Sequence, residues 1–414
     1  MKNQASLQRY LNLLVEQGCN PQPGQPALIQ CEPSALPLVP LAAQAFYRRG
    51  VRYVDYNINL PQMERLHLLE APPERLKFYP TYKSVQIDQL VDSKGCMLAF
   101  MSHDEPDLYA DLSPAQQGRL NEMLVARRDA TRRMREEGVL QRAVSWCGAG
   151  AVSPQWAAKV FPDLPSEEAI EALWTDIFRM TFADREDCAQ LWSQHLDTLA
   201  VRSRQLNERG LRKLQFLNPS LGTDLEVTLS QKARWVSGRT TTASGISVCL
   251  NIPTYEVFTT PDWRGTQGTV AITRPVMING SLVEGLRLRF ENGEIVHAEA
   301  TRNLAAYQAL IHTAGDDTAR RLGEVALVGI DSPIYQSGRL YHHTLYDENA
   351  ACHIATGMAY TVGLENGDQL AAEELDALGC NRNSRTHQDV MISDDQTTVL
   401  GDGQELMVNG RWVL

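Results

Sequence analysis

The chain has 414 residues, of which 43% are hydrophobic and 21% are charged, and this composition excludes a disordered or fibrous protein. One hydrophobic core rarely holds a chain of this length, so we expect two domains. The net charge of −11 argues against binding to nucleic acid, because contacts with phosphate groups need a clustered basic surface.

The N-terminus and the cysteines indicate a cytoplasmic protein. Residues 1–20 lack the uninterrupted apolar stretch of a signal peptide, and no later segment has the length and apolar character of a membrane span. The eight cysteines are scattered without a C-x-x-C pair, which is typical of reduced, mostly buried thiols. We therefore expect a cytoplasmic protein that does not bind membranes.

The N-terminal half alternates between strand and helix patterns. Residues 27–31 form a short apolar run, residues 37–49 have helical spacing, and residues 51–58 again resemble a strand. Further strands are expected at residues 97–101 and 142–147. Because β-α-β units give parallel strands, we predict an α/β domain with a parallel sheet. The glycine-rich motifs of nucleotide-binding proteins do not occur, so we expect no nucleotide cofactor.

Two long polar stretches with helical spacing follow, at residues 113–137 and 185–209. Gly138 and Gly210 stand directly after them, where glycine commonly ends a helix. We place the domain boundary just beyond the second helix, which gives an N-terminal domain of residues 1–214.

The second domain, residues 215–414, has a β-rich pattern. Apolar and β-branched runs predict strands at residues 225–229, 247–252, 270–273, 281–290 and 324–330. The pairs Asn279-Gly280 and Asn292-Gly293 are typical of tight hairpin turns. We therefore predict an α+β domain with a mixed or antiparallel sheet, and we expect it to carry the catalytic metal site.

His387 and Asp389 are the first pair of candidate ligands. On a strand, residues two apart project from the same face, so both side chains can point into one pocket while Gln388 points away. An ordinary polar pair on the surface of a strand is the alternative.

Residues 347–360 read as a helix, with Asp347 as its N-cap. His353 and Tyr360 are seven residues apart and would share a face of that helix. Glu348 would lie about 140° from His353, so it can contribute only if the first turn is irregular. The alternative is a histidine and a tyrosine packed in the core.

Glu256 and Glu324 each begin an apolar run that we predict to be a buried strand. A carboxylate that enters a core costs several kcal/mol unless it is paired or bound to a metal. The alternative for each glutamate is a position at the edge of the sheet, still in water.

Together these segments supply two or three glutamates, one aspartate and two histidines, a set that suits a pair of divalent ions. Zinc, cobalt and manganese all accept such ligands. Two ions about 3.5 to 4 Å apart lower the pKa of a shared water and polarise a carbonyl, which is the chemistry of a hydrolase. In a binding module these residues would be structural, but such a module has no need to gather so many ligands.

Four segments in the C-terminal half resemble the signatures of the aminopeptidase T/aminopeptidase S (PepS) family of metallo-aminopeptidases, in the family's order. They are residues 251–261, 322–328, 344–353 and 383–392. Similar segments near residues 18–25 and 206–225 extend the resemblance over most of the chain. Val390 stands where the family usually has an aromatic residue, and this departure leaves the substrate preference open.

The resemblance implies metal ligation by Glu256, Glu324, His353, His387 and Asp389. Glu348 would be a further ligand or the general base, and Tyr360 would be a site tyrosine that donates a hydrogen bond to the oxyanion. The resemblance also implies release of N-terminal amino acids from short peptides, by a homodimer that encloses its active sites. The domain of residues 1–214 would then help form the dimer or the substrate pocket. A metal-dependent amidohydrolase or esterase acting on small molecules is the alternative, because it would use the same ions.

Overall fold

The computed structural model describes residues 3–278, 280–312 and 315–414. These residues form two compact units, each assembled from three stretches of the chain. Unit 1 contains residues 1–108, 123–197 and 238–254, and unit 2 contains residues 109–122, 198–237 and 255–414. The division into domains of residues 1–214 and 215–414 stays a prediction.

Unit 1 is built around a parallel sheet, which confirms the predicted α/β fold. The strands follow the order β10 (Asn251–Ile252), β4 (Ser145–Gly150), β3 (Cys96–Met101), β1 (Pro26–Cys31) and β2 (Tyr53–Ile58). Each neighbouring pair in this order is parallel. The side chains of β1, β3 and β4 are mostly buried, whereas β2 lies at an edge and is largely exposed.

The helices of unit 1 are α1 (Gln4–Leu13), α2 (Val39–Arg48), α3 (Pro61–Glu70), α4 (Thr81–Asp92), α6 (Pro154–Val160) and α7 (Ser166–Met180). A π-helical turn, Leu14–Cys19, continues α1, and 3-10 turns cover Pro33–Leu38 and Pro73–Arg75. A small strand pair, β8 (Thr240–Thr241) with β9 (Ser247–Val248), completes the unit.

The two long predicted helices are α5 (Pro114–Ala130) and α8 (Cys188–Arg209), and each contributes residues to both units. Beyond α5 the chain forms a π-helical turn, Met134–Leu140, and Gly138 lies inside this turn. The predicted helix end at Gly138 is therefore wrong. A Cβ atom at Gly138 would lie 2.7 Å from the sulfur of Met134, so a larger residue would require the Met134 side chain to move. Gly210 follows α8 in the left-handed conformation, as predicted.

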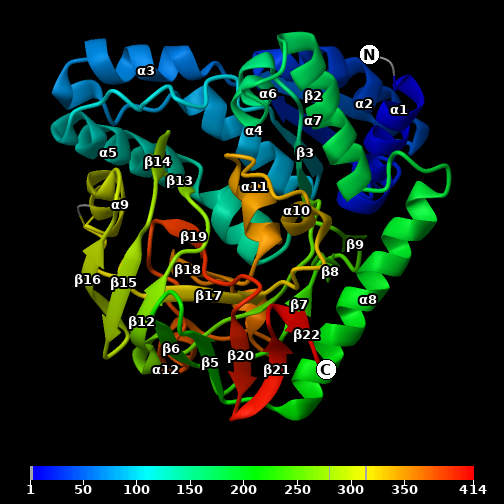
Figure 1. Cartoon of the computed structure of the whole chain (residues 1–414). Helices are drawn as coiled ribbons and strands as arrows, with labels where there is room; N and C mark the ends of the chain where they lie inside the picture. Colours follow the sequence, from blue (N-terminus) through cyan, green and yellow to red (C-terminus); the bar gives the residue numbers. More distant parts are fainter. Residues whose placement is uncertain (1–2, 279, 313–314) are drawn as a thin grey trace. The chain divides into compact units, whose positions relative to one another are not determined.

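Unit 2 contains antiparallel sheets and thereby confirms the second half of the predicted fold class. The larger sheet has the order β16 (Glu294–Glu299), β15 (Arg287–Glu291), β12 (Gln267–Ala271), β6 (Thr223–Thr228), β5 (Lys213–Asn218), β20 (Thr398–Gly401), β21 (Gln404–Val408) and β22 (Arg411–Trp412). The other sheet has the order β19 (His387–Met391), β18 (His353–Gly357), β17 (Leu322–Leu327), β11 (Val257–Thr259) and β7 (Val236–Ser237) (Figure 1).

Short elements connect these strands. They are a hairpin of β13 (Val276–Ile278) and β14 (Ser281–Val283), the helices α9 (Leu304–Ile311), α10 (Pro333–Gln336), α11 (Thr344–Asp347) and α12 (Ala372–Ala377), and the 3-10 turns Trp263–Gly265, Glu348–Ala350 and Thr361–Gly363. The predicted hairpin at Asn292-Gly293 is confirmed, since both residues have positive φ between β15 and β16. In the other predicted pair, Asn279 lies outside the described residues.

The helix predicted for residues 347–360 is wrong. Only α11 and a 3-10 turn are helical here, and His353–Gly357 is the strand β18. The strand pairs with β17 on one side and β19 on the other, and all five of its residues are buried. Pairing on both edges outweighs the helix preference of the alanines, which is weak compared with tertiary packing.

All eight cysteines are buried and free, which confirms the prediction of reduced, mostly buried thiols. None of the helices in the described ranges has the length and apolar character needed to cross a membrane.

Candidate metal centre

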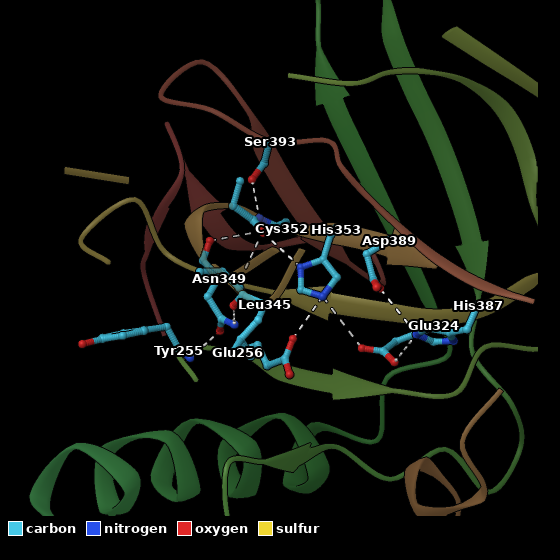
Figure 2. A network of polar contacts seen from close by, with 12 residues as sticks. Tyr255, Glu256, Glu324, Leu345, Asn349, Cys352, His353, His387, Asp389 and Ser393 are labelled. Atoms are coloured by element: carbon cyan, nitrogen blue, oxygen red, sulfur yellow. Dashed lines mark hydrogen bonds and ion pairs between the residues drawn. The ribbon is translucent and has the colours of Figure 1, made fainter. Parts of the chain in front are cut away.

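The candidate ligands lie on one face of the sheet formed by β11, β17, β18 and β19. Glu324 on β17 stands opposite Ala355 on β18, which in turn stands opposite Asp389 on β19. Directly opposite residues share a face of a sheet, as do residues two apart along a strand. His353 and His387 therefore project from the same face as the two carboxylates (Figure 2). The strand predicted for residues 387–389 is confirmed.

Small residues keep this face open between the ligands. Ala355 separates Glu324 from Asp389 and carries only a methyl group. Gly357 stands opposite His387 with φ +102, and a Cβ atom there would lie 2.2 Å from the carbonyl oxygen of Thr386. Any larger residue at position 357 would displace the strand that carries both His387 and Asp389.

A β-bulge precedes Glu324. The register between β17 and β18 shifts between Leu322 and Glu324. Gly323 lies at this bulge, and a Cβ atom there would lie 2.3 Å from the carbonyl oxygen of Met358. Since bulges redirect the side chains that follow them, the glycine fixes the direction of Glu324.

Two further carboxylates come from connecting segments. Glu256 immediately precedes β11, and Glu348 begins the 3-10 turn that follows α11. The Glu256 side chain is 12% exposed and Glu348 is 9% exposed. The 3-10 turn Glu348–Ala350 is thus the irregular turn that Glu348 needs in order to join the candidate ligands, although a strand and not a helix follows it.

Glu324 and His353 are at the centre of the cluster. The Nε2 atom of His353 is 3.0 Å from Oε2 of Glu256 and 3.8 Å from Oε1 of Glu324. The second oxygen of Glu324, Oε2, is 3.7 Å from Nε2 of His387, which is 3.5 Å from Oδ1 of Asp389. Glu324 therefore faces two imidazole rings, one with each oxygen (Figure 2).

These separations fit a divalent cation. Two atoms that bind one zinc ion at about 2.1 Å with tetrahedral angles lie about 3.4 Å apart. The distances of 3.5, 3.7 and 3.8 Å are close to this value, and the 3.0 Å contact is a hydrogen bond that small movements would open. Among the described residues, Glu256, Glu324 and His353 each offer a ligand atom, all within 4.8 Å of one another.

Backbone carbonyls orient both histidines. The Nδ1 atom of His353 is 3.1 Å from the carbonyl oxygen of Ala351, and Nδ1 of His387 is 2.7 Å from that of Met358. A carbonyl can only accept a hydrogen bond, so each Nδ1 carries a proton and each Nε2 faces the carboxylates. This is the usual orientation of a histidine that binds a metal through Nε2, once Nε2 has lost its own proton.

The cluster concentrates negative charge in a buried place. Burial raises the pKa of Glu348 well above its ordinary value, and the charges of Asp389 and Glu256 raise it further. Burial and the charge of Glu256 raise the pKa of Glu324 to about 8. Burial lowers the pKa of His387, but the charges of Asp389 and Glu324 outweigh it and bring this pKa to about 9. A cation bound among these groups would relieve their mutual repulsion.

The family described as thermophilic metalloprotease (M29) matches residues 3–412. The chain belongs to this family. Aminopeptidase 2 of Geobacillus stearothermophilus is 36% identical over 411 residues, which are 98% of this chain and 97% of the relative. Aminopeptidase PepS of Streptococcus thermophilus is 35% identical over 415 residues, 99% of this chain and 98% of the relative. The solved structure of wild-type AmpT from Thermus thermophilus has a TM-score of 0.88 and 34% identity, with 100% of both chains covered.

Membership of the M29 family confirms the resemblance to the aminopeptidase T and PepS sequences. It also confirms the prediction of an enzyme, a metallo-aminopeptidase that hydrolyses peptide bonds. The roles of individual residues stay predictions.

Tyr360 lies beside the cluster, but not on a helix shared with His353. It follows β18 and precedes the 3-10 turn Thr361–Gly363, and its ring centroid is 4.9 Å from that of His387. The hydroxyl of Thr260 donates to its carbonyl oxygen at 2.6 Å. Burial raises the pKa of Tyr360, and the charges of the nearby carboxylates, Glu324 first, raise it further. The hydroxyl therefore stays protonated and can donate a hydrogen bond.

Two polar residues beside Glu348 have roles that sequence reasoning missed. Asp347 is not a helix N-cap, because its side chain accepts hydrogen bonds from the backbone of Tyr341 at 2.8 Å and of His343 at 3.0 Å. Asn349 is completely buried and hydrogen-bonded at both ends of its amide. Asp347, Glu348 and Asn349 are three consecutive polar residues in an apolar segment. This run could have indicated their roles from the sequence, because buried polar groups need hydrogen-bond partners.

Proposed function

We propose that this metallo-aminopeptidase binds two divalent ions and releases N-terminal amino acids from short peptides. The observation that carries the two-ion proposal is the position of Glu324, whose two oxygens face two different histidines. The first half of the site would consist of Glu256, Glu324 and His353. The second half would consist of Glu324, His387 and Asp389. A carboxylate shared between the halves is the usual bridge in a two-metal site.

The residues suit zinc, cobalt or manganese, because carboxylate and imidazole ligands are accepted by all three. When bound, such ions supply a water of lowered pKa and polarise the carbonyl of the substrate.

Glu348 is our candidate for the general base. Burial and the neighbouring carboxylates raise the pKa of Glu348, and a raised pKa suits a group that exchanges protons near neutral pH. Its carboxylate would take a proton from the attacking water and return it to the leaving amine. Ligation of an ion by Glu348 is the alternative.

Tyr360 would stabilise the oxyanion. Its hydroxyl keeps its proton because burial and the carboxylates raise its pKa. The ring of Tyr360 lies 4.9 Å from that of His387, and its hydroxyl could donate to the substrate's carbonyl oxygen as that atom gains negative charge.

We also propose that the enzyme is a homodimer. Large exposed hydrophobic side chains gather in one stretch of unit 1, on β2, α3, α4 and the segments between them: Tyr53, Tyr56, Ile58, Leu60, Met63, Leu66, Leu69, Phe78, Tyr82 and Val85. Aromatic side chains bury about 150 to 250 Å² each when fully covered, so Tyr53, Tyr56, Phe78 and Tyr82 could supply a large part of the roughly 800 Å² per partner of a stable interface. Sedimentation velocity measures the oligomeric state directly, and a monomer at micromolar concentration would contradict the proposal. The cytoplasmic location stays a prediction.

A comparison of a short peptide with its N-acetylated form tests the aminopeptidase activity. An acetyl group removes the charge of the α-amine and adds bulk where the pocket should end. Each buried polar group left without a partner costs about 1 to 3 kcal/mol, so kcat/KM should fall by at least about tenfold. Mass spectrometry identifies the products. Equal cleavage of both peptides would favour the broader amidohydrolase activity instead.

A further inference from the structure

Glu256 and Glu348 lack the support that the other candidate ligands receive from the sheet. Glu324, His353, His387 and Asp389 lie on paired strands, whose hydrogen bonds fix their register. Glu256 and Glu348 lie in connecting segments, far apart in the sequence. The Glu256 carboxylate contacts His353 on the sheet at 3.0 Å, but this contact does not fix the backbone next to Glu256 relative to the backbone next to Glu348.

One side chain joins the two segments. Asn349 directly follows Glu348, and its Oδ1 accepts a hydrogen bond of 2.6 Å from the backbone N–H of Tyr255. Tyr255 directly precedes Glu256. Figure 2 shows Asn349 beside Tyr255, next to the Glu256 carboxylate. This hydrogen bond therefore connects the Asn349 side chain, next to Glu348, with the backbone next to Glu256.

The remaining contacts of Asn349 fix its own orientation. Its Nδ2 donates to the carbonyl oxygen of Leu345 at 2.9 Å, and its backbone carbonyl accepts from the hydroxyl of Ser332 at 2.6 Å. Since Oδ1 faces an N–H and Nδ2 faces a carbonyl, rotation of the amide by 180° would break both bonds. The side chain is 0% exposed, so water cannot replace either partner.

We propose that Asn349 is a positioning residue, which holds the Glu256 and Glu348 segments at the separation that the two ions require. The proposal rests on the two-ion function proposed above. The hydrogen-bond partners of Asn349 are Tyr255, Leu345 and Ser332, so it would act on the ions through the two carboxylates. Loss of its side chain would leave the sheet residues in place and release the two connecting segments from one another.

Asn218 provides a matched control in the same unit. It ends β5 in the larger sheet and is also 0% exposed. Its Nδ2 donates to Asp394 at 2.8 Å and to Thr397 at 3.1 Å, and its Oδ1 accepts from Ser220 at 2.6 Å. Substitution of Asn218 by alanine removes a buried, fully hydrogen-bonded amide, as in Asn349→Ala, without touching a candidate ligand segment.

The test measures the affinity for Zn²⁺ and Mn²⁺ by competition with a chelator, in the full-length wild-type protein, Asn349→Ala and Asn218→Ala. Residues that support metal ligands typically change affinity by about 10 to 100-fold, and we expect this loss in Asn349→Ala. In Asn218→Ala we expect the melting temperature to fall while the affinity stays within about twofold of wild type, because its contacts do not reach the ligands. Asn349→Ser, whose shorter side chain places its hydroxyl farther from both backbone groups, should also bind the ions more weakly and replaces the alanine variant if that variant does not fold.

Wild-type affinity in both Asn349 variants would overturn the positioning role, and so would an equal loss in Asn218→Ala. If the wild-type protein itself binds no divalent ion, the proposed two-ion function fails, which is a different outcome.

Discussion

The candidate ligands are held in place in two ways, by paired strands and by contacts between connecting segments. The difference shows which substitutions would disturb metal binding most. Glu324, His353, His387 and Asp389 are held by the ladder of β17, β18 and β19, so many backbone hydrogen bonds share the task. Between the segments of Glu256 and Glu348, the side chain of Asn349 accepts a hydrogen bond from the backbone of Tyr255. We therefore expect ligands on the sheet to decide whether the ions bind, and residues outside it to adjust how tightly they bind and how fast the enzyme works.

The largest effect is expected for Glu324→Ala. This change removes the carboxylate that faces both histidines and so disrupts both halves of the proposed site. Activity on an aminoacyl-p-nitroanilide should fall to that of wild-type protein after exhaustive chelation, because the activated water depends on the ions. Elemental analysis should find less bound metal. Glu291→Ala, an exposed carboxylate on β15, is the control, and a Glu324→Ala enzyme with normal metal content would refute the bridging role.

A smaller effect is expected for Glu348→Gln. The amide keeps the shape of the side chain but cannot take up a proton, so kcat should fall by about 10³-fold, within the range for general acid–base catalysis. The metal content should stay near that of wild type. A loss of metal together with activity would instead identify Glu348 as a ligand, and an unchanged kcat would remove it from the mechanism.

The smallest of the three effects is expected for Tyr360→Phe. The ring can still pack on His387, while the hydroxyl can no longer donate to the oxyanion, so kcat should fall by about 10²-fold with the metals retained. Tyr307→Phe, a buried tyrosine on α9, is the matched control for packing. A kcat equal to that of wild type would make Tyr360 a packing residue only.

The sequence predicted which residues gather, but not how the chain brings them together. Alternation of strands and helices was enough for the parallel sheet of unit 1, and the i and i+2 rule was enough for His387 and Asp389. The segment around His353 was predicted as a helix, because its alanines favour one and because pairing with β17 and β19 cannot be seen in a single segment.

The contacts that orient the candidate ligands could not be predicted from the sequence either. The carbonyls of Ala351 and Met358 that orient the histidines, and the bond between Asn349 and Tyr255, depend on backbone positions fixed only when the sheet forms. The residue types in the sequence indicate which side chains could bind a metal. The register between strands that are distant in the sequence decides where those side chains lie.

Because all eight thiols are buried, their reaction with alkylating reagents can be used to follow unfolding. Burial raises the pKa of Cys31 and Cys188 to about 11 and that of Cys96 to about 12, so little thiolate exists at neutral pH. Alkylating reagents attack the thiolate, and they must also reach it. The rate at which such a reagent consumes the cysteines therefore measures how often each unit opens, with cysteines such as Cys96 reporting on unit 1 and Cys380 on unit 2.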